Sequence, residues 1–135
     1  YTVEKQGKRA AVATDMGCFD DTIIRVLGQC DSVLIEANHD INMLQVGPYP
    51  YSLKMRILGN KGHLSNTSCA DLIKEILHKD LKHLVLGHLS RENNFPQLAY
   101  RTVLDELEKT ETWGTLDTRL MVASRDEPTE LLKIN

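Results

Sequence analysis

Blocks of apolar and polar residues alternate along the chain and predict a layered α/β fold. Short apolar runs within residues 10–15, 32–35 and 84–86 end abruptly in polar residues, as the buried strands of a parallel sheet do. Between these runs apolar residues return at helical spacing, most clearly over residues 69–77. The predicted order is strand, helix, strand, helices, strand, helix and hairpin, forming a single α/β domain over residues 1–135.

Turn and cap residues mark where the predicted elements begin and end. The alternating residues of 1–15, interrupted by a turn around Gly7, predict an N-terminal hairpin. Two apolar runs around a turn at 126–128 predict a C-terminal hairpin over residues 119–134. Capping residues and Gly or Pro signals predict helices at residues 20–28, 40–47, 50–58, 65–77 and 96–107.

Composition and charge narrow the class of protein. A chain of 135 residues with 41% hydrophobic and 26% charged residues has room for one core, which excludes a disordered chain and two full domains. No apolar run approaches the length of a membrane span. The net charge of −3 excludes an overall positive field that would attract nucleic acid, although basic residues outnumber acidic ones in the stretch 51–100.

The cysteines and the first residues of the chain indicate the cellular compartment that we expect for the protein. The three cysteines are an odd number without metal-finger spacing, so neither a disulfide framework nor a zinc ribbon is predicted and a reducing cytoplasm is expected. The chain opens without a signal core, so we expect no export, and without Met, so we expect it to be part of a longer protein.

Ionisable side chains follow three predicted strands at the point where each strand ends. Asp15, Glu36 and His88 hold these positions, and His39 and His63 lie in adjoining loops. The carboxyl ends of parallel strands meet at one edge of the sheet, where ligands bind in α/β folds. Carboxylate and imidazole together suit a divalent metal, and they also serve as acid and base around a metal-bound water.

From spacing alone, structural roles explain the same residues better than a metal site does. Asp15 can cap the next helix, Glu36 can pair with a surface Lys, and the histidines can be solvated or packed. His78 and His83 are interpreted as structural, and Cys18 as a buried thiol rather than a nucleophile. The glycines form no phosphate loop or dinucleotide fingerprint, and aromatic residues, at 5%, are too few and scattered to predict a base-stacking module.

Five sequence blocks together resemble a known family. VATDMG, IEANHDINML, GPYPYSLKMRIL, GHLSNTSCADLI and HLVLGHLSRENNFPQLA, over about residues 8–108, resemble the second half of the YycJ-like branch of the metallo-β-lactamase superfamily. The resemblance implies the C-terminal αβ half of an αββα sandwich with two divalent metal ions: zinc, manganese or iron. It also implies a phosphodiesterase or nuclease that uses a metal-activated water.

The resemblance assigns roles to individual residues. Asp15 matches the carboxylate that bridges the two metals, and His88 matches the late histidine ligand of the second metal. Glu36 and His63 resemble the catalytic pair that steadies phosphate charge or protonates the leaving oxygen.

The resemblance and the local charge also suggest residues that contact the substrate. His39 and Asp40 are expected to contact substrate or to support structurally the part of the site formed by Glu36 and His63. Lys54, Arg56 and Lys61 are expected to receive a phosphate backbone.

The HxHxDH motif of the superfamily is absent from the chain. Asp15 and His88 alone are fewer donors than the three that a catalytic zinc normally takes from protein. The chain is therefore expected to pair with an N-terminal half or to form a dimer. The alternative is a non-catalytic, metal-free scaffold that works through partner binding.

Overall fold

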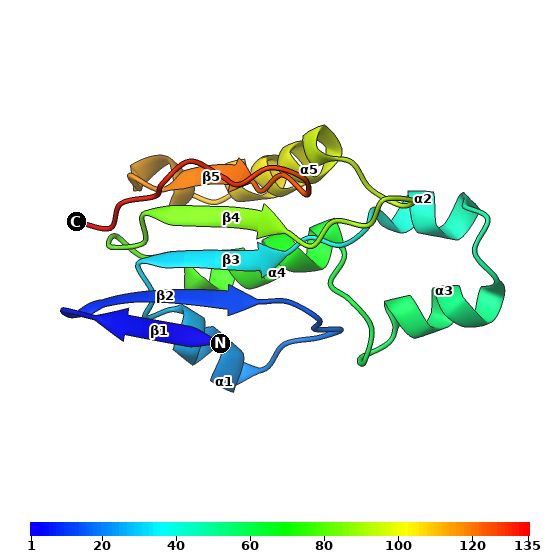
Figure 1. The fold of residues 1–135 in the computed structure, drawn as a ribbon, viewed down its shortest axis with the longest axis horizontal. Coiled ribbons are helices and arrows are strands. Elements are labelled where there is room, and N and C mark those ends of the chain that lie inside the picture. The colour runs from blue at the N-terminus through cyan, green and yellow to red at the C-terminus, as the bar shows by residue number, and fades with distance from the viewer.

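A computed structural model describes all residues 1–135 and contains one five-stranded sheet in the order β1-β2-β3-β4-β5 (Figure 1). The strands are β1 (Thr2–Lys5), β2 (Lys8–Ala13), β3 (Ser32–Glu36), β4 (His83–Gly87) and β5 (Arg119–Val122). The helices are α1 (Asp21–Leu27), α2 (Ile41–Val46), α3 (Tyr51–Leu58), α4 (Asn66–Ile76), α5 (Pro96–Glu108) and a 3-10 turn, η1 (Trp113–Thr115). The predicted α/β class is confirmed.

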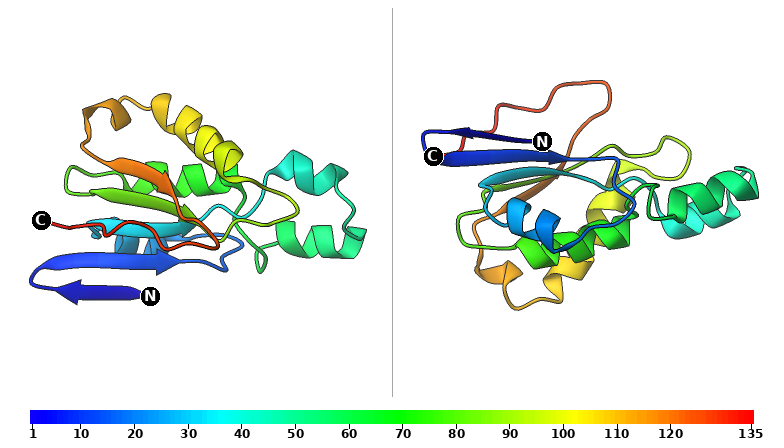
Figure 2. Two further views of the ribbon diagram at one scale, coloured as in Figure 1. Left: turned by 45° about the horizontal axis from the view of Figure 1, so that its top comes forward. Right: turned by 90° about the horizontal axis from the view of Figure 1, so that it is seen from below.

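The strand directions explain where the helices lie. β1 pairs antiparallel with β2 through a tight turn at Gln6 and Gly7, both at positive φ, while β2, β3, β4 and β5 run parallel. Each parallel connection moves to the next strand in the same direction, and such crossovers are nearly always right-handed. α1, α4 and α5 therefore all lie on one face of the sheet, and the opposite face carries no helix (Figure 2).

The core lies between the sheet and these three helices. α4 contributes its buried stripe, as predicted, and α5 contributes Ala99, Val103 and Leu107. Alternate residues of the central strands, such as Val33 and Ile35, complete it. This packing fixes the carboxyl ends of β2, β3 and β4 relative to one another.

Capping side chains fix where the helices begin. Asp20 accepts a hydrogen bond from the Ile23 amide (2.9 Å), Asp40 from Met43 (2.8 Å), and Ser65 from Ser68 (3.1 Å). Asp20, and not Asp15, caps α1, so the structural role considered for Asp15 is wrong. None of the helices has both the length and the apolar character needed to cross a bilayer.

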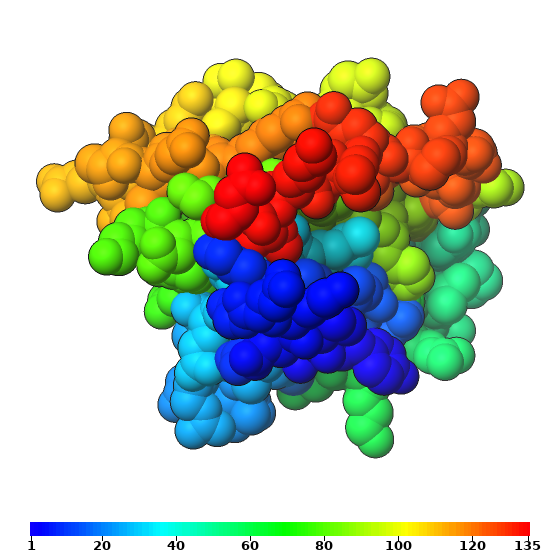
Figure 3. Space-filling view, turned by 60° about the vertical axis from the view of Figure 1, so that its left-hand side comes forward, coloured from blue at the N-terminus to red at the C-terminus, as the bar shows by residue number.

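The helix-free face carries a row of apolar side chains. Val12, Leu34, Val85 and Met121 are neighbours across β2, β3, β4 and β5 and lie outside the main core. Figure 3 shows the C-terminal residues (red) beside the β1–β2 hairpin (blue), with part of β3 visible between them.

The predicted C-terminal hairpin is wrong. Only Arg119–Val122 forms a strand, and residues 129–134 join no ladder. They return across the helix-free face (Figures 1 and 2), where Leu132 and Ile134 are half-buried. Contact with an existing apolar surface thus replaces the strand pairing that their pattern predicted.

α2 and α3 stand beyond the carboxyl edge of the sheet (Figure 1). α3 has no buried residue, so its position depends on the loops at its two ends rather than on core packing. The polar residues that follow the strands face this pair of helices.

Candidate metal centre

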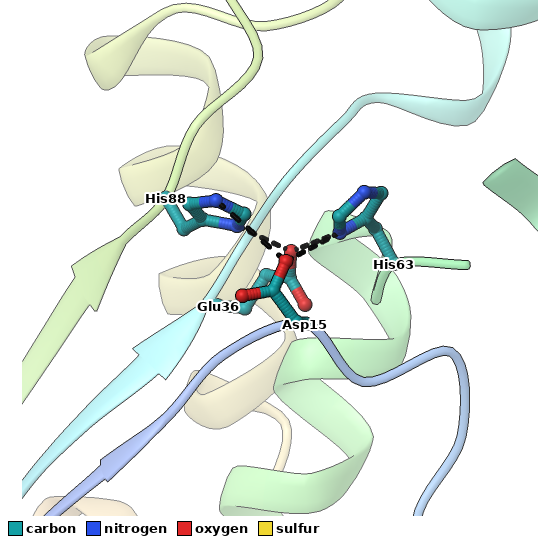
Figure 4. Close-up of side chains that lie close together, drawn as sticks. All are labelled: Asp15, Glu36, His63 and His88. Atoms are coloured by element: carbon teal, nitrogen blue, oxygen red, sulfur yellow. Dashed lines mark hydrogen bonds and ion pairs between the residues drawn. The ribbon is translucent and has the colours of Figure 1, made fainter. Parts of the chain in front are cut away.

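Four ionisable side chains converge at the carboxyl edge of the sheet (Figure 4). Asp15 follows β2, Glu36 ends β3, His88 follows β4, and His63 comes from the loop between α3 and α4. One potential ligand atom from each lies within 4.8 Å of the others. The sequence-predicted metal and catalytic residues are therefore neighbours, although residues 15 and 88 are far apart along the chain.

Glu36 lies beneath the two imidazoles and is fully buried. Its Oε1 atom is 2.6 Å from Nδ1 of His63 and 2.7 Å from Nδ1 of His88. Its Oε2 atom accepts a hydrogen bond from the Met16 amide at 3.1 Å. Both rings thus face Glu36 with Nδ1, which leaves their Nε2 atoms outside this contact. Pairing with a surface Lys, the alternative considered for Glu36, is excluded.

Asp15 lies opposite the two rings and is largely exposed. Its Oδ1 atom is 3.9 Å from Nε2 of His88 and 3.8 Å from Nδ1 of His63. Two bonds of about 2.0 to 2.2 Å to one metal ion span at most about 4.3 Å between ligand atoms. The separation of Asp15 and His88 therefore fits joint ligation of one divalent ion.

Backbone strain coincides with these two positions. Asp15 (φ +58°) and His88 (φ +55°) adopt the left-handed conformation, and outside the β1–β2 turn they are the only non-glycine residues that do. This conformation is unfavourable for residues with a Cβ and, where it persists, is often associated with function.

Glycines allow close backbone approaches in both loops, the one that carries Asp15 and the one that carries His63. A Cβ on Gly17 would lie 2.4 Å from the Asn60 carbonyl oxygen, and one on Gly62 would lie 2.1 Å from that of Ile57. Cys18, beside Gly17, is exposed, so the expectation of a buried thiol is wrong.

Asparagines in the sequence blocks hold the surrounding loops together. Asn66 and Asn94 are buried and exchange two amide hydrogen bonds (3.1 and 2.8 Å), and Asn94 also donates to the Ala37 carbonyl (2.9 Å). Asn38 donates to the His88 carbonyl at 2.9 Å. These contacts join the loops after β3 and β4 to the start of α4. They thereby hold in place the loops that surround the cluster.

His39 and Asp40 lie apart from the cluster. Burial, with a smaller effect of His63, lowers the pKa of His39 to about 4, so the ring is neutral, and its buried Nε2 has no hydrogen-bond partner. Asp40 caps α2. Neither lines the hollow above the cluster, so the structural role considered for both agrees with their positions, and direct substrate contact stays a prediction.

A hollow of about 990 Å³ opens above the cluster. Four cationic side chains line it: Arg56, Lys61, Arg91 and Arg125. None of the four forms an ion pair, and Asp15 is the only carboxylate in the lining. The hollow is therefore suited to an anionic ligand, despite the negative charge of the whole chain.

The basic residues only partly match the sequence prediction. Arg56 and Lys61 line the hollow as expected, but Lys54 does not: its ammonium group donates to the Gln45 and Gly47 carbonyls, both at 2.7 Å. Arg91 and Arg125 were missed. Their positions in the loops after β4 and β5 carried the same strand-end signal that identified His88.

Comparison with known proteins shows which proteins the chain is related to. It is 37% identical to the exodeoxyribonuclease WalJ of Streptococcus pneumoniae over 134 residues, which is 99% of this chain and 50% of that protein. It is 35% identical to the exodeoxyribonuclease YycJ of Bacillus anthracis over 109 residues, covering 81% of this chain and 41% of that protein. The chain spans about half the length of the curated relatives it matches.

These identities confirm the resemblance to the YycJ-like branch, and the chain is a homologue of the WalJ and YycJ proteins. No family model matches the chain, and no solved structure gives a significant match.

Proposed function

We propose that this chain forms part of a metal-dependent nuclease that hydrolyses DNA. The convergence of Asp15, Glu36, His63 and His88 beneath a cationic hollow carries the proposal. The names of the relatives, which are exodeoxyribonucleases, support DNA as the substrate.

Asp15 and His88 are the proposed metal ligands. Their 3.9 Å separation and the free Nε2 atom of His88 suit a divalent ion such as zinc, manganese or iron. A bound divalent ion of this kind would supply Lewis acidity and a water of lowered pKa. Two donors from this chain are too few for a catalytic zinc, so a two-metal centre requires further ligands from elsewhere.

The proposed source of those ligands is a second αβ half that covers the helix-free face. Val12 supports this, since it is 45% exposed although its strand β2 is paired on both sides, whereas Val85 of the same row is already buried. The chain is then the C-terminal half of an αββα sandwich, completed by an N-terminal half or by a second copy.

Glu36 and His63 are the proposed catalytic pair. Glu36 does not line the hollow, so it acts by holding the Nδ1 edges of His63 and His88 and aiming their Nε2 edges. His63 lines the hollow, and with a proton on both ring nitrogens it would pass the Nε2 proton to the leaving oxygen while Nδ1 stays bonded to Glu36. The four cations compensate the phosphate charge.

The test is DNA hydrolysis by the full-length protein supplied with zinc or manganese. We expect Asp15→Asn and His88→Ala each to lower the rate at least about 100-fold. Asp21→Asn, which changes an exposed carboxylate on α1 outside the hollow, should leave the rate unchanged.

Full activity in Asp15→Asn would refute the role of this site. A protein that binds no metal and cleaves no DNA would favour the alternative function, a metal-free scaffold whose apolar sheet face binds a partner.

A further inference from the structure

Two aromatic side chains line the hollow together with its cations. Tyr49 comes from the connection between α2 and α3, and Phe95 comes from the loop before α5. In the sequence these residues are 46 positions apart, so their common location depends on the fold. The fold therefore brings two aromatic side chains to one hollow, although aromatic residues are few and scattered along the sequence.

The backbone of Phe95 is held by hydrogen bonds, and its side chain is exposed. Its amide donates to Oδ1 of Asn94 at 3.0 Å, and Asn94 is itself fixed by Asn66 and the Ala37 carbonyl. Phe95 lines the hollow, and the residue is 48% exposed. An exposed apolar ring in a hollow lined by cations is the combination on which single-stranded nucleic acids stack their bases.

The cations that share the hollow with this ring come from separate elements. Arg91 lies in the same loop as Phe95, and Arg125 lies after β5, where it donates to the Leu89 carbonyl. Arg56 reaches the hollow from α3. A strand that placed a base on Phe95 would therefore have its phosphates near positive charge, which the Asp15 side chain alone opposes.

We propose that the hollow binds the unpaired terminal nucleotide of a DNA strand, with its base stacked on Phe95 and Tyr49 and its phosphates near Arg91, Arg125 and Arg56. This inference rests on the proposed nuclease function and specifies the form of its substrate. A volume of about 990 Å³ suits one or two nucleotides. Removing a base from a duplex costs a few kcal/mol and least where it is already unpaired, and the exodeoxyribonuclease names of the relatives support a nucleotide at a strand end.

The test measures binding and stacking separately from hydrolysis. A single-stranded oligonucleotide carries the fluorescent base 2-aminopurine at either end or in the middle, and binding to the full-length protein is measured in EDTA. We expect quenching of a terminal 2-aminopurine on binding. Phe95→Ala should weaken binding on the order of 10-fold to 100-fold and remove the quenching, while Phe95→Tyr should retain both.

Tyr51→Ala is the matched control, because Tyr51 is an exposed aromatic residue on α3 that does not line the hollow. It should leave the affinity unchanged. An oligonucleotide whose terminal nucleotide is abasic should bind as weakly to the wild type as the intact one binds to Phe95→Ala.

Unchanged affinity and quenching in Phe95→Ala, or equal binding of intact and abasic ends, would overturn the inference. The proposed nuclease function would survive that result if the wild type still hydrolysed DNA with metal. Conversely, loss of terminal stacking in Phe95→Ala in a protein that hydrolyses no DNA would support the binding inference and refute the nuclease proposal alone.

Discussion

The strained backbone conformation of Asp15 is explained by the function of its side chain and not by the fold. The residue holds a left-handed backbone conformation, yet its side chain makes only a weak contact with Thr14 (3.4 Å) besides the two histidines. Nothing in the fold requires an aspartate there, so the backbone cost is retained for the carboxylate itself.

Replacing Asp15 by glycine should therefore stabilise the metal-free protein relative to Asp15→Ala. Both variants lose the carboxylate, but only glycine adopts φ +58° without a Cβ penalty. We expect a difference in the free energy of unfolding of about 1 kcal/mol, measured by urea denaturation in EDTA. Equal stability of the two variants would show that the backbone at this position carries no strain.

His39 should make the metal-free protein sensitive to mild acid. Burial lowers its folded pKa to about 4, whereas an unfolded histidine titrates near 6.5, so only the unfolded chain takes up the proton between these values. Stability is thus complete above about pH 6.5 and falls as the pH drops towards 4, by up to about 3 kcal/mol.

His39→Gln, which cannot titrate, provides the comparison. Its unfolding free energy should fall less than that of the wild type over the same pH range, as followed by urea denaturation at several pH values. Parallel pH curves for the two proteins would mean that His39 is not the residue responsible.

At the scale of elements, local signals predicted most of the fold. Asp20, Asp40, Gly28 and Pro96 mark helix ends in the sequence, and the structure uses them there. The final strand pair failed because the choice between a sheet edge and the helix-free face depends on tertiary packing.

The site was partly predictable for a related reason. Residues that follow parallel strands reach a common edge whatever the details of packing, so Asp15, Glu36 and His88 could be grouped from the sequence. The placement of one Glu36 oxygen between two imidazoles depends on how the loops pack. No local pattern encodes that arrangement.

The approach of the β2–α1 loop to the loop before α4 offers a test at this scale. Gly17→Ala would place a Cβ 2.4 Å from the Asn60 carbonyl oxygen and must push apart the loops that carry Asp15 and His63. We expect a loss of about 1 to 3 kcal/mol in stability, with weaker zinc binding by calorimetry.

Gly114→Ala is the matched control, because a Cβ there meets nothing within 4 Å. Its stability and zinc affinity should match those of the wild type. If Gly17→Ala also behaves like the wild type, close contact between these loops does not position the cluster.

For the whole molecule, one sheet face is covered by helices, the other carries an apolar row that the C-terminal residues partly cover, and the ionisable cluster lies at the sheet's carboxyl edge. This asymmetry, together with a chain spanning about half the length of its relatives, underlies the proposal that a second half completes the centre.

A crystal of the full-length protein soaked in zinc, with diffraction recorded on both sides of the zinc absorption edge, tests the central proposal most directly. If Asp15 and His88 bind the metal, we expect an anomalous peak about 2.0 to 2.2 Å from both the Asp15 carboxylate and Nε2 of His88. Well-ordered imidazoles still bound to Glu36, with the zinc peak elsewhere or absent, would contradict it.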